Sequence, residues 1–319
     1  MRVTFWGTRG SLPTPLNAHD FRDKAKHLLM NAKRRDLASE ASVDSYLDSC
    51  RLPKAMTFGG NTPCVEINKG TDRIILDCGS GLRQLGIDMM EKGVEKGSRI
   101  NILMTHSHWD HIMGFPFFSP ALAGTVDIHV YGVHPNLKDR FDQQMDRVHF
   151  PITMDEMSAS ITFHQIPSEE EITIDQFKIT NKGLHHPGGS YAYRISTGGK
   201  DIIFATDGEY NDPSNNRLVP YIDFFRDADV LIFDAMYSTL EQAVEKENYG
   251  HSTAVIGVDL ALYAEVKKLI LFHHDPESDD KQIADSFFAA QDYLDTRRNE
   301  FPDNGMIIES AYDGMIIDV

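Results

Sequence analysis

The feature that most constrains this chain is a short apolar run leading directly into a cluster of histidines. Ile100-Asn101-Ile102-Leu103-Met104 reads as a strand, and the six residues His106-Ser107-His108-Trp109-Asp110-His111 follow it. They therefore lie at the carboxyl end of a strand, where ligand sites in mixed α/β folds gather. His106 and His108 point the same way from extended backbone, whereas Asp110 and His111 come after a turn and reach a neighbouring point. Imidazole suits zinc and a carboxylate suits a second, more open site, so the pattern predicts two adjacent metal ions.

Six residues cannot complete two coordination shells, so further ligands are expected at other strand ends. Three segments qualify: His185-His186-Pro187, Asp207 after the apolar run 202–205, and His273-His274 after Leu269-Ile270-Leu271-Phe272. Asp207 suits a bridge because its two carboxylate oxygens can hold both cations. Spacing alone leaves open which residue of each histidine pair is the ligand.

Short strands and helices alternate along the chain, which predicts two packed sheets with helices outside, a four-layer α/β sandwich. The predicted strands are 3–6, 63–68, 73–78, 100–104, 126–131, 160–166, 172–180, 191–196, 201–206, 229–234 and 267–273, and the predicted helices are 80–92, 136–147, 215–227, 252–265 and 278–297. One domain, 1–319, is expected. Residues 16–56 are expected to be a helical insertion, with helices over about 20–37 and 42–50, that either packs on the domain or serves as a lid or dimer contact.

Composition limits the class of protein. The 31 Lys and Arg stand against 48 Asp and Glu, a formal charge of −17 that disfavours a long nucleic acid as partner. Two bound cations would still allow a small anionic substrate. Cys50, Cys64 and Cys78 suggest neither a disulfide framework nor a CxxC metal site. The N-terminal residues lack a secretory pattern and no apolar run is long enough to cross a membrane, so a cytoplasmic protein without membrane contact is expected.

Taken together, these segments resemble the metallo-β-lactamase superfamily over nearly the whole chain apart from the insertion. Its HxHxDH signature stands here as His106, His108, Asp110 and His111, and its earlier aspartate motif is like Asp77 in LDCGSG. The resemblance implies the αββα fold with water between two ions. It implies a first metal site of His106, His108 and His186, a second of Asp110, His111 and His273, with Asp207 shared. Asp77 would orient a ligand histidine, and His185 and His274 remain candidate outer residues.

Within the superfamily the chain is most similar to the phosphodiesterase branch, which includes ribonuclease Z and cyclic-nucleotide phosphodiesterases. The passages that carry this are VTFWGTRGS, GGNTPCVEI, HPGGSYAYRI and DAMYS followed by GHSTA. In that branch an acidic residue placed like Asp234 and a histidine placed like His251 act beside the scissile phosphate. The alternative for His251 is a loop residue before the helix that starts near Ser252. No Gly-rich arm of the kind that ribonuclease Z uses on tRNA is evident.

The function predicted from the sequence is hydrolysis of a small phosphodiester, such as a cyclic nucleotide, by two divalent ions. Zinc is expected, with manganese or iron as alternatives, and the catalytic residues are Asp110, His251 and Asp234. A ribonuclease Z-like RNA endonuclease is the alternative, as is a thioester, lactone or β-lactam hydrolase on the same metals. A non-catalytic metal-stabilised binding protein is the third class. A homodimer is expected, because phosphodiesterase relatives tend to pair and the insertion offers an apolar face.

Overall fold

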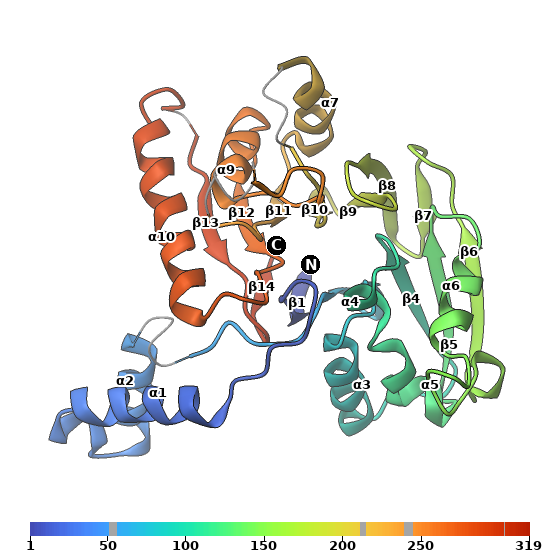
Figure 1. Ribbon diagram of the computed structural model, residues 1–319, viewed down its shortest axis with the longest axis horizontal. Helices are drawn as coiled ribbons and strands as arrows, with labels where there is room; N and C mark the ends of the chain where they lie inside the picture. Colours follow the sequence, from blue (N-terminus) through green and yellow to red (C-terminus); the bar gives the residue numbers. More distant parts are fainter. Residues whose placement is uncertain (51–55, 211–214, 239–244, 303) are drawn as a thin grey trace.

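Two seven-stranded mixed sheets stack face to face with helices on their outer surfaces (Figure 1). The computed structural model describes residues 1–50, 56–210, 215–238, 245–302 and 304–319. The four-layer αββα prediction is confirmed. Because each sheet buries one face on the other sheet and one face under helices, its central strands are apolar on both sides.

The first sheet comes mostly from the N-terminal half of the chain. Its strands, in spatial order, are β14 (Ile316–Asp318), β1 (Arg2–Gly7), β2 (Cys64–Lys69), β3 (Asp72–Leu76), β4 (Ser98–Met104), β5 (Val126–Gly132) and β6 (Ser160–Gln165). The strands β3 to β6 run parallel. On its outer face lie α3 (Gly81–Lys92), α5 (Ser119–Ala123) and α6 (Leu137–Gln144), which bury apolar side chains such as Leu85, Ala121 and Phe141.

The second sheet comes from the C-terminal half. Its order is β13 (Ile307–Ser310), β12 (Lys268–Phe272), β11 (Val230–Asp234), β10 (Lys200–Ala205), β9 (Ser190–Thr197), β8 (Phe177–Leu184) and β7 (Ile172–Ile174). The strands β10 to β13 are parallel, so their carboxyl ends share one edge. The helices α7 (Asn215–Phe225), α9 (Ala254–Tyr263) and α10 (Asp280–Arg297) cover the outer face.

The core between the sheets is built from inward-facing side chains of both. Phe5 of β1, Phe204 of β10 and Phe272 of β12 are fully buried there, with ring centroids 6.1 Å and 5.4 Å apart for the Phe5–Phe272 and Phe204–Phe272 pairs. These contacts fix the two sheets against each other, and so fix the relative positions of the loops at their edges.

Within 16–56, the described residues form α1 (Ala18–Asn31), a 3₁₀ turn (Arg34–Leu37) and α2 (Glu40–Ser49). The predicted helix 20–37 thus ends early, at Asn31. In Figure 1 these blue elements project away from the sheets, and neither helix contains a buried residue.

Other differences from the sequence-based expectation are local. The predicted strand 172–180 is a hairpin of β7 and β8, and the two short strands β13 and β14 were missed. The strands β13 and β14 have four and three residues and take edge positions, so they give too little alternation to detect. No helix of the described residues is long and apolar enough to cross a membrane.

Candidate metal centre

Strand ends from both sheets converge on one cluster of histidines and aspartates. The segment His106–His111 follows β4, His186 lies in the connection from β8 to β9, Asp207 follows β10 and His273 follows β12. Both sheets therefore contribute ligand candidates, and Figure 1 places the short helix α4 (Trp109–Ile112) near the centre of the molecule between them.

Three histidines form the first group. Possible ligand atoms of His106, His108 and His186 all lie within 4.8 Å of one another. His186 Nε2 is 3.0 Å from His108 Nδ1, and the same nitrogen is 3.8 Å from Asp207 Oδ2. His106 Nε2 is 3.7 Å from that oxygen. Three imidazole nitrogens and one carboxylate oxygen therefore enclose one point.

The second group is Asp110, His111, Asp207 and His273, again with ligand atoms within 4.8 Å of one another. His111 Nε2 is 3.2 Å from both Asp110 Oδ2 and Asp207 Oδ1. His273 Nε2 is 3.3 Å from the same two oxygens. Ligands about 2.0–2.1 Å from a tetrahedral ion are about 3.3 Å apart, so these separations fit a metal ion. The two oxygens of Asp207 face the two groups separately.

Buried atoms without partners support the same interpretation. The Nε2 atoms of His106 and His111 are buried and make no hydrogen bond within the described structure. A buried polar nitrogen without a partner is costly unless it binds a ligand. The clustered side chains thus have the composition and spacing of a divalent metal site, together with buried nitrogen atoms that lack a partner.

The electrostatics put the carboxylates in the state that metal ligands need. Burial alone would raise the pKa of Asp110, but His111 and His273 outweigh it and hold that pKa well below its usual range. For Asp207, too, burial is opposed by His273 and His111, which lower the pKa. Burial lowers the pKa of His106 well below its ordinary value, so its ring is neutral and can bind a cation.

Three of these strand-end residues adopt left-handed backbone. Asp77, Asp207 and His273 have φ of 61°, 56° and 59°. The left-handed region costs a non-glycine residue roughly 1–2 kcal/mol, and here it turns the chain sharply so that the side chain faces the cluster. The space is tight, since a Cβ added to Gly10 would lie 2.6 Å from Nδ1 of His273.

Asp77, buried beneath the cluster, holds two of its elements in place. Its Oδ2 is 2.8 Å from His111 Nδ1, and its two oxygens accept hydrogen bonds from the backbone N–H and the hydroxyl of Thr105, each at 2.8 Å. The ring of His111 therefore keeps Nε2 directed at the second group. The Thr105 hydroxyl is also 3.1 Å from Nδ1 of His106.

The structure brings one residue of each histidine pair into the cluster. His186 donates from Nδ1 to the carbonyl of Gly250 at 2.9 Å, which leaves Nε2 for the first group. His185 is exposed, with Nε2 3.4 Å from Asn248 Oδ1. His274 turns away and donates to the carbonyl of Ala311 at 2.8 Å, with its pKa lowered to about 3 by burial.

His251 and Asp234 form a pair directly beside the second group. His251 Nδ1 is 2.8 Å from Asp234 Oδ2, and the His251 ring stacks on His273 with centroids 5.1 Å apart. The fully buried Asp234 also accepts the backbone N–H of Asp207 at 3.0 Å. Asp234 thus connects the shared carboxylate with His251, whose side chain is 11% exposed.

Sequence reasoning missed several contributors to this geometry. The Ser11 backbone N–H donates to Asp110 Oδ2 at 2.8 Å, and Glu209 Oε2 accepts the N–H of Gly250 at 3.1 Å. Ser11 also has a positive φ of 57°. Its only sequence signal is the Gly-rich start GTRGS, which marks a turn without saying what the turn faces.

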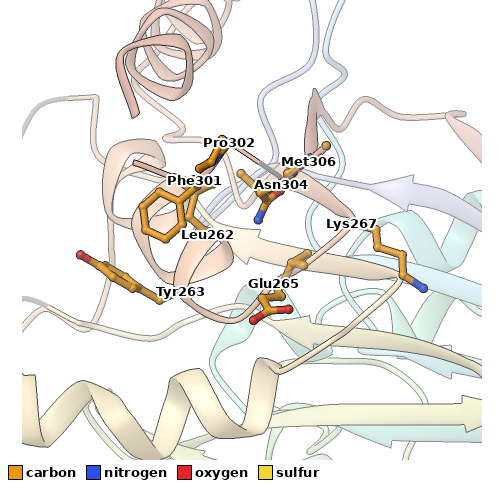
Figure 2. Close-up of a pocket in the computed structure, with 10 residues that line it drawn as sticks. Leu262, Tyr263, Glu265, Lys267, Phe301, Pro302, Asn304 and Met306 are labelled. Carbon is orange, nitrogen blue, oxygen red and sulfur yellow. Dashed lines mark hydrogen bonds between the residues drawn. The ribbon is translucent and has the colours of Figure 1, made fainter. Parts of the chain in front are cut away.

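A cavity also lies away from the candidate metal centre. This cavity of about 610 Å³ is lined by residues that include Tyr263, Glu265, Lys267, Phe301 and Met306 (Figure 2). It lies at the start of β12, whereas the metal centre follows the end of that strand. No histidine or cysteine lines it, so it lacks the chemistry of the strand-end cluster.

Comparison with known proteins agrees with the fold and the position of the cluster. A family model described as a beta-lactamase superfamily domain matches residues 72–274, well over half of the chain. The chain belongs to the metallo-β-lactamase superfamily. It is a hydrolase of this fold, and a metal-dependent one. The matched span includes every candidate ligand named above.

Individual relatives share this architecture. The ribonuclease Z of Picrophilus torridus is 25% identical over 272 residues, which cover 70% of this chain and 84% of the relative. Human tRNase Z, short form, gives a TM-score of 0.61 at 20% identity over 100% of this chain and 99% of the other. A diphosphatase from the PhnP family gives a TM-score of 0.58 at 17% identity, covering 99% and 97% of the two chains.

These relatives correct one sequence-based prediction. The formal charge of −17 led to the expectation that a long nucleic acid is an unlikely partner, and that prediction is wrong. Curated relatives over most of the chain are ribonuclease Z proteins, and a solved neighbour is a tRNase Z. The physical reason is that net charge averages over the whole surface, whereas binding depends on the local field at the site, where bound divalent ions would invert it.

Proposed function

We propose that this chain hydrolyses phosphodiesters with two divalent ions, held by His106, His108 and His186 on one side and by Asp110, His111 and His273 on the other, with Asp207 between. Two groups of ligand atoms support the number of ions, because Asp207 directs Oδ2 at the first group and Oδ1 at the second. Divalent ions held there would lower the pKa of a water molecule towards neutrality and neutralise the phosphate oxygens.

The chain's own residues supply orientation and proton transfer. Asp77 fixes the ring of His111, and the Gly250 carbonyl fixes the ring of His186. Asp110, whose low pKa keeps it ionised, accepts the Ser11 N–H and can also hold a proton of the attacking water. His251 uses Nδ1 to face Asp234 and therefore has Nε2 left to donate to a leaving alkoxide.

The His251–Asp234 pair is the single observation that carries the choice of phosphodiesters. A diester with an alkoxide leaving group needs a proton donor beside the metal centre, and this pair lies directly against His273. Hydrolysis of a thioester on the same metals would not need that donor, because a thiolate is a much better leaving group than an alkoxide.

Leaving-group dependence tests this assignment. We expect His251→Ala to lower kcat by roughly 10²–10⁴ on a diester with a poor alkoxide leaving group, the range that general acids supply. The loss should be much smaller on bis-p-nitrophenyl phosphate, because p-nitrophenolate needs no proton. Asp234→Asn should show a weaker form of the same contrast, and His185→Ala, at the exposed neighbour of His186, serves as control. Equal losses on both substrates, or a lost metal ion, would remove the role given to His251.

Two sizes of diester are candidates. The sequence-based proposal is a small diester such as a cyclic nucleotide. The second candidate is a phosphodiester near the end of an RNA, and the ribonuclease Z relatives favour it. A panel of cyclic mononucleotides, bis-p-nitrophenyl phosphate, an RNA precursor, a thioester and a β-lactam, each with zinc or manganese, separates these classes. Turnover of the thioester or the β-lactam alone would contradict the proposal.

Finer parts of this proposal have their own measurements. Zinc as the metal, and two equivalents per chain, are checked by elemental analysis after gentle purification, where one ion or none would count against two. The cytoplasmic location and the treatment of 1–319 as one domain stay predictions, for which fluorescence microscopy and limited proteolysis are the measurements.

A further inference from the structure

A half-buried arginine reaches the metal centre from the outer layer of helices. Arg140 of α6 donates from Nη1 to Ser107 Oγ at 2.8 Å. Ser107 stands between His106 and His108, whose ring centroids are 4.5 Å apart. The guanidinium therefore binds the residue that lies in the sequence between two members of the first ligand group.

Arg140 is unusual because the described structure gives it no acidic partner. Among the described residues, no carboxylate oxygen lies within 4.0 Å of its nitrogens, in a chain with 48 acidic residues. Lys138, two residues earlier on the same helix, pairs with Asp142 at 2.7 Å. A half-buried cation held by a single neutral hydroxyl has most of its donors left for an anion that is not part of the protein.

A second unpartnered group lies in the same region. His134, only 6% exposed, has a buried Nε2 without a hydrogen-bond partner. Burial lowers its pKa and the nearby Arg140 guanidinium lowers it further, whereas the backbone of Gly189 and Thr105 raises it.

The connection that carries His186 leaves room beside these groups. Gly188 and Gly189 have positive φ of 82° and 81°, so larger residues are strained there. A Cβ at Gly189 would lie 3.3 Å from His134 Cε1, and one at Gly188 would lie 3.8 Å from His108 Nε2. The glycine pair thus borders both His134 and the first ligand group, and a side chain at Gly189 would press on His134.

We propose that Arg140, Ser107 and His134 form an anion subsite beside the metal centre, which binds a phosphate group of the substrate other than the one that is cleaved. This inference rests on the proposed phosphodiesterase function. A guanidinium binds phosphate through two parallel hydrogen bonds, which is the geometry this residue type provides best. The substrate class is therefore a nucleotide diester that carries a flanking phosphate.

The test uses a matched pair of substrates, the dinucleotide ApA and its 5′- or 3′-phosphorylated forms. The wild-type enzyme should have the lower KM for a phosphorylated form, and Arg140→Ala should raise that KM on the order of tenfold or more, the value of a charge-assisted hydrogen bond. Its kcat, and its KM for ApA, should change little. Arg140→Lys should recover part of the effect as a point charge, and Lys138→Ala is the control on the same helix.

Inorganic pyrophosphate provides a readout that does not depend on turnover. Calorimetry of the metal-loaded protein should show roughly tenfold weaker binding to Arg140→Ala than to wild type, at unchanged metal content. An unchanged phosphate preference together with unchanged pyrophosphate affinity would overturn the subsite, and so would loss of metal, which indicates that Arg140 only positions Ser107. If wild type cleaves no diester, the proposed function fails, and the pyrophosphate result decides the subsite alone.

Discussion

Asp313 hydrogen-bonds both to the chain before the insertion and to the chain after it. Its Oδ1 accepts the N–H of Thr8 at 3.1 Å, and its Oδ2 accepts the N–H groups of Gly60 and Asn61 at 3.0 and 2.9 Å. Ser11, which contacts Asp110, lies three residues beyond Thr8. The Asp313 carboxylate thus supports the loop behind the metal centre.

Asp313 predicts a pH dependence of stability. Burial raises its pKa to about 6, against the N–H donors of Asn61 and Gly60 that lower it. The usual unfolded value is about 3.9, so the folded state binds this proton more tightly. The stabilisation that this proton gives to the folded state is complete below about pH 4. It is lost as pH rises through about 6, at about 1 kcal/mol per pH unit. Asp313→Asn should flatten the dependence of the free energy of unfolding on pH in this range, measured by urea unfolding from pH 4 to 7. Parallel profiles for both proteins would contradict it.

At this scale the structure brings together candidate ligands that the sequence named, but the sequence could not choose between neighbours. His106, His108 and His111 were predictable from spacing because a strand end and a short turn have few geometries. His273 and His274 could not be separated, because the left-handed φ of 59° at His273 breaks the alternation of the preceding strand. Arg140 carried no signal at all, since contact between α6 and Ser107 is tertiary.

At the scale of elements, the helices of 16–56 differ most from expectation. The apolar residues at helical spacing predicted a face packed on something, yet Phe21, Leu29 and Met30 are 66%, 69% and 75% exposed. An ion pair of 2.8 Å between Lys24 and Asp280 holds α1 to the body. The periodicity correctly predicted helices but did not indicate what covers them, because a pattern within one chain does not identify its partner.

We expect a second copy of this chain to cover that face. Residues 18–37, which we call the helical arm, carry six Lys or Arg against three Asp, whereas the formal net charge of the whole chain is −17. The charge of the helical arm is therefore complementary to the average surface of another copy. Light scattering at micromolar concentration should give the mass of two chains, and Phe21→Ser with Leu29→Ser should give one. Val148→Ser, at a residue 86% exposed outside the helical arm, is the control. A wild-type mass of one chain would remove this prediction.

For the whole molecule, the metal centre joins the two halves of the fold. His106, His108, Asp110 and His111 follow a strand of the first sheet, and His186, Asp207 and His273 belong to the second. The sequence predicted the sandwich because alternating short strands and helices admit few architectures. The position of the edge strand β14 was not predictable, because it depends on contacts over more than 200 residues, such as Arg2 with Asp318.

Metal removal should therefore lower the stability of the whole fold. A ligand present at about 100 times its Kd stabilises the native state by about 2.7 kcal/mol, so chelation should lower Tm by several degrees in a thermal melt. Asp207→Ala should melt lower than wild type before chelation, bind less of both ions and lose almost all activity, and chelation should shift its Tm little. His185→Ala should respond to chelator like wild type. An unchanged wild-type Tm on chelation would argue against ions that bridge the halves.

The left-handed backbone at Asp77, Asp207 and His273 also has an evolutionary consequence. Glycine relieves such a conformation at no steric cost, and asparagine does so in part. Selection for stability alone would therefore favour those residues at all three positions, and each replacement would remove a side chain from the metal centre or its support. Selection for function must oppose that drift at these three positions, so loss of activity in a descendant of this chain would be expected to begin there.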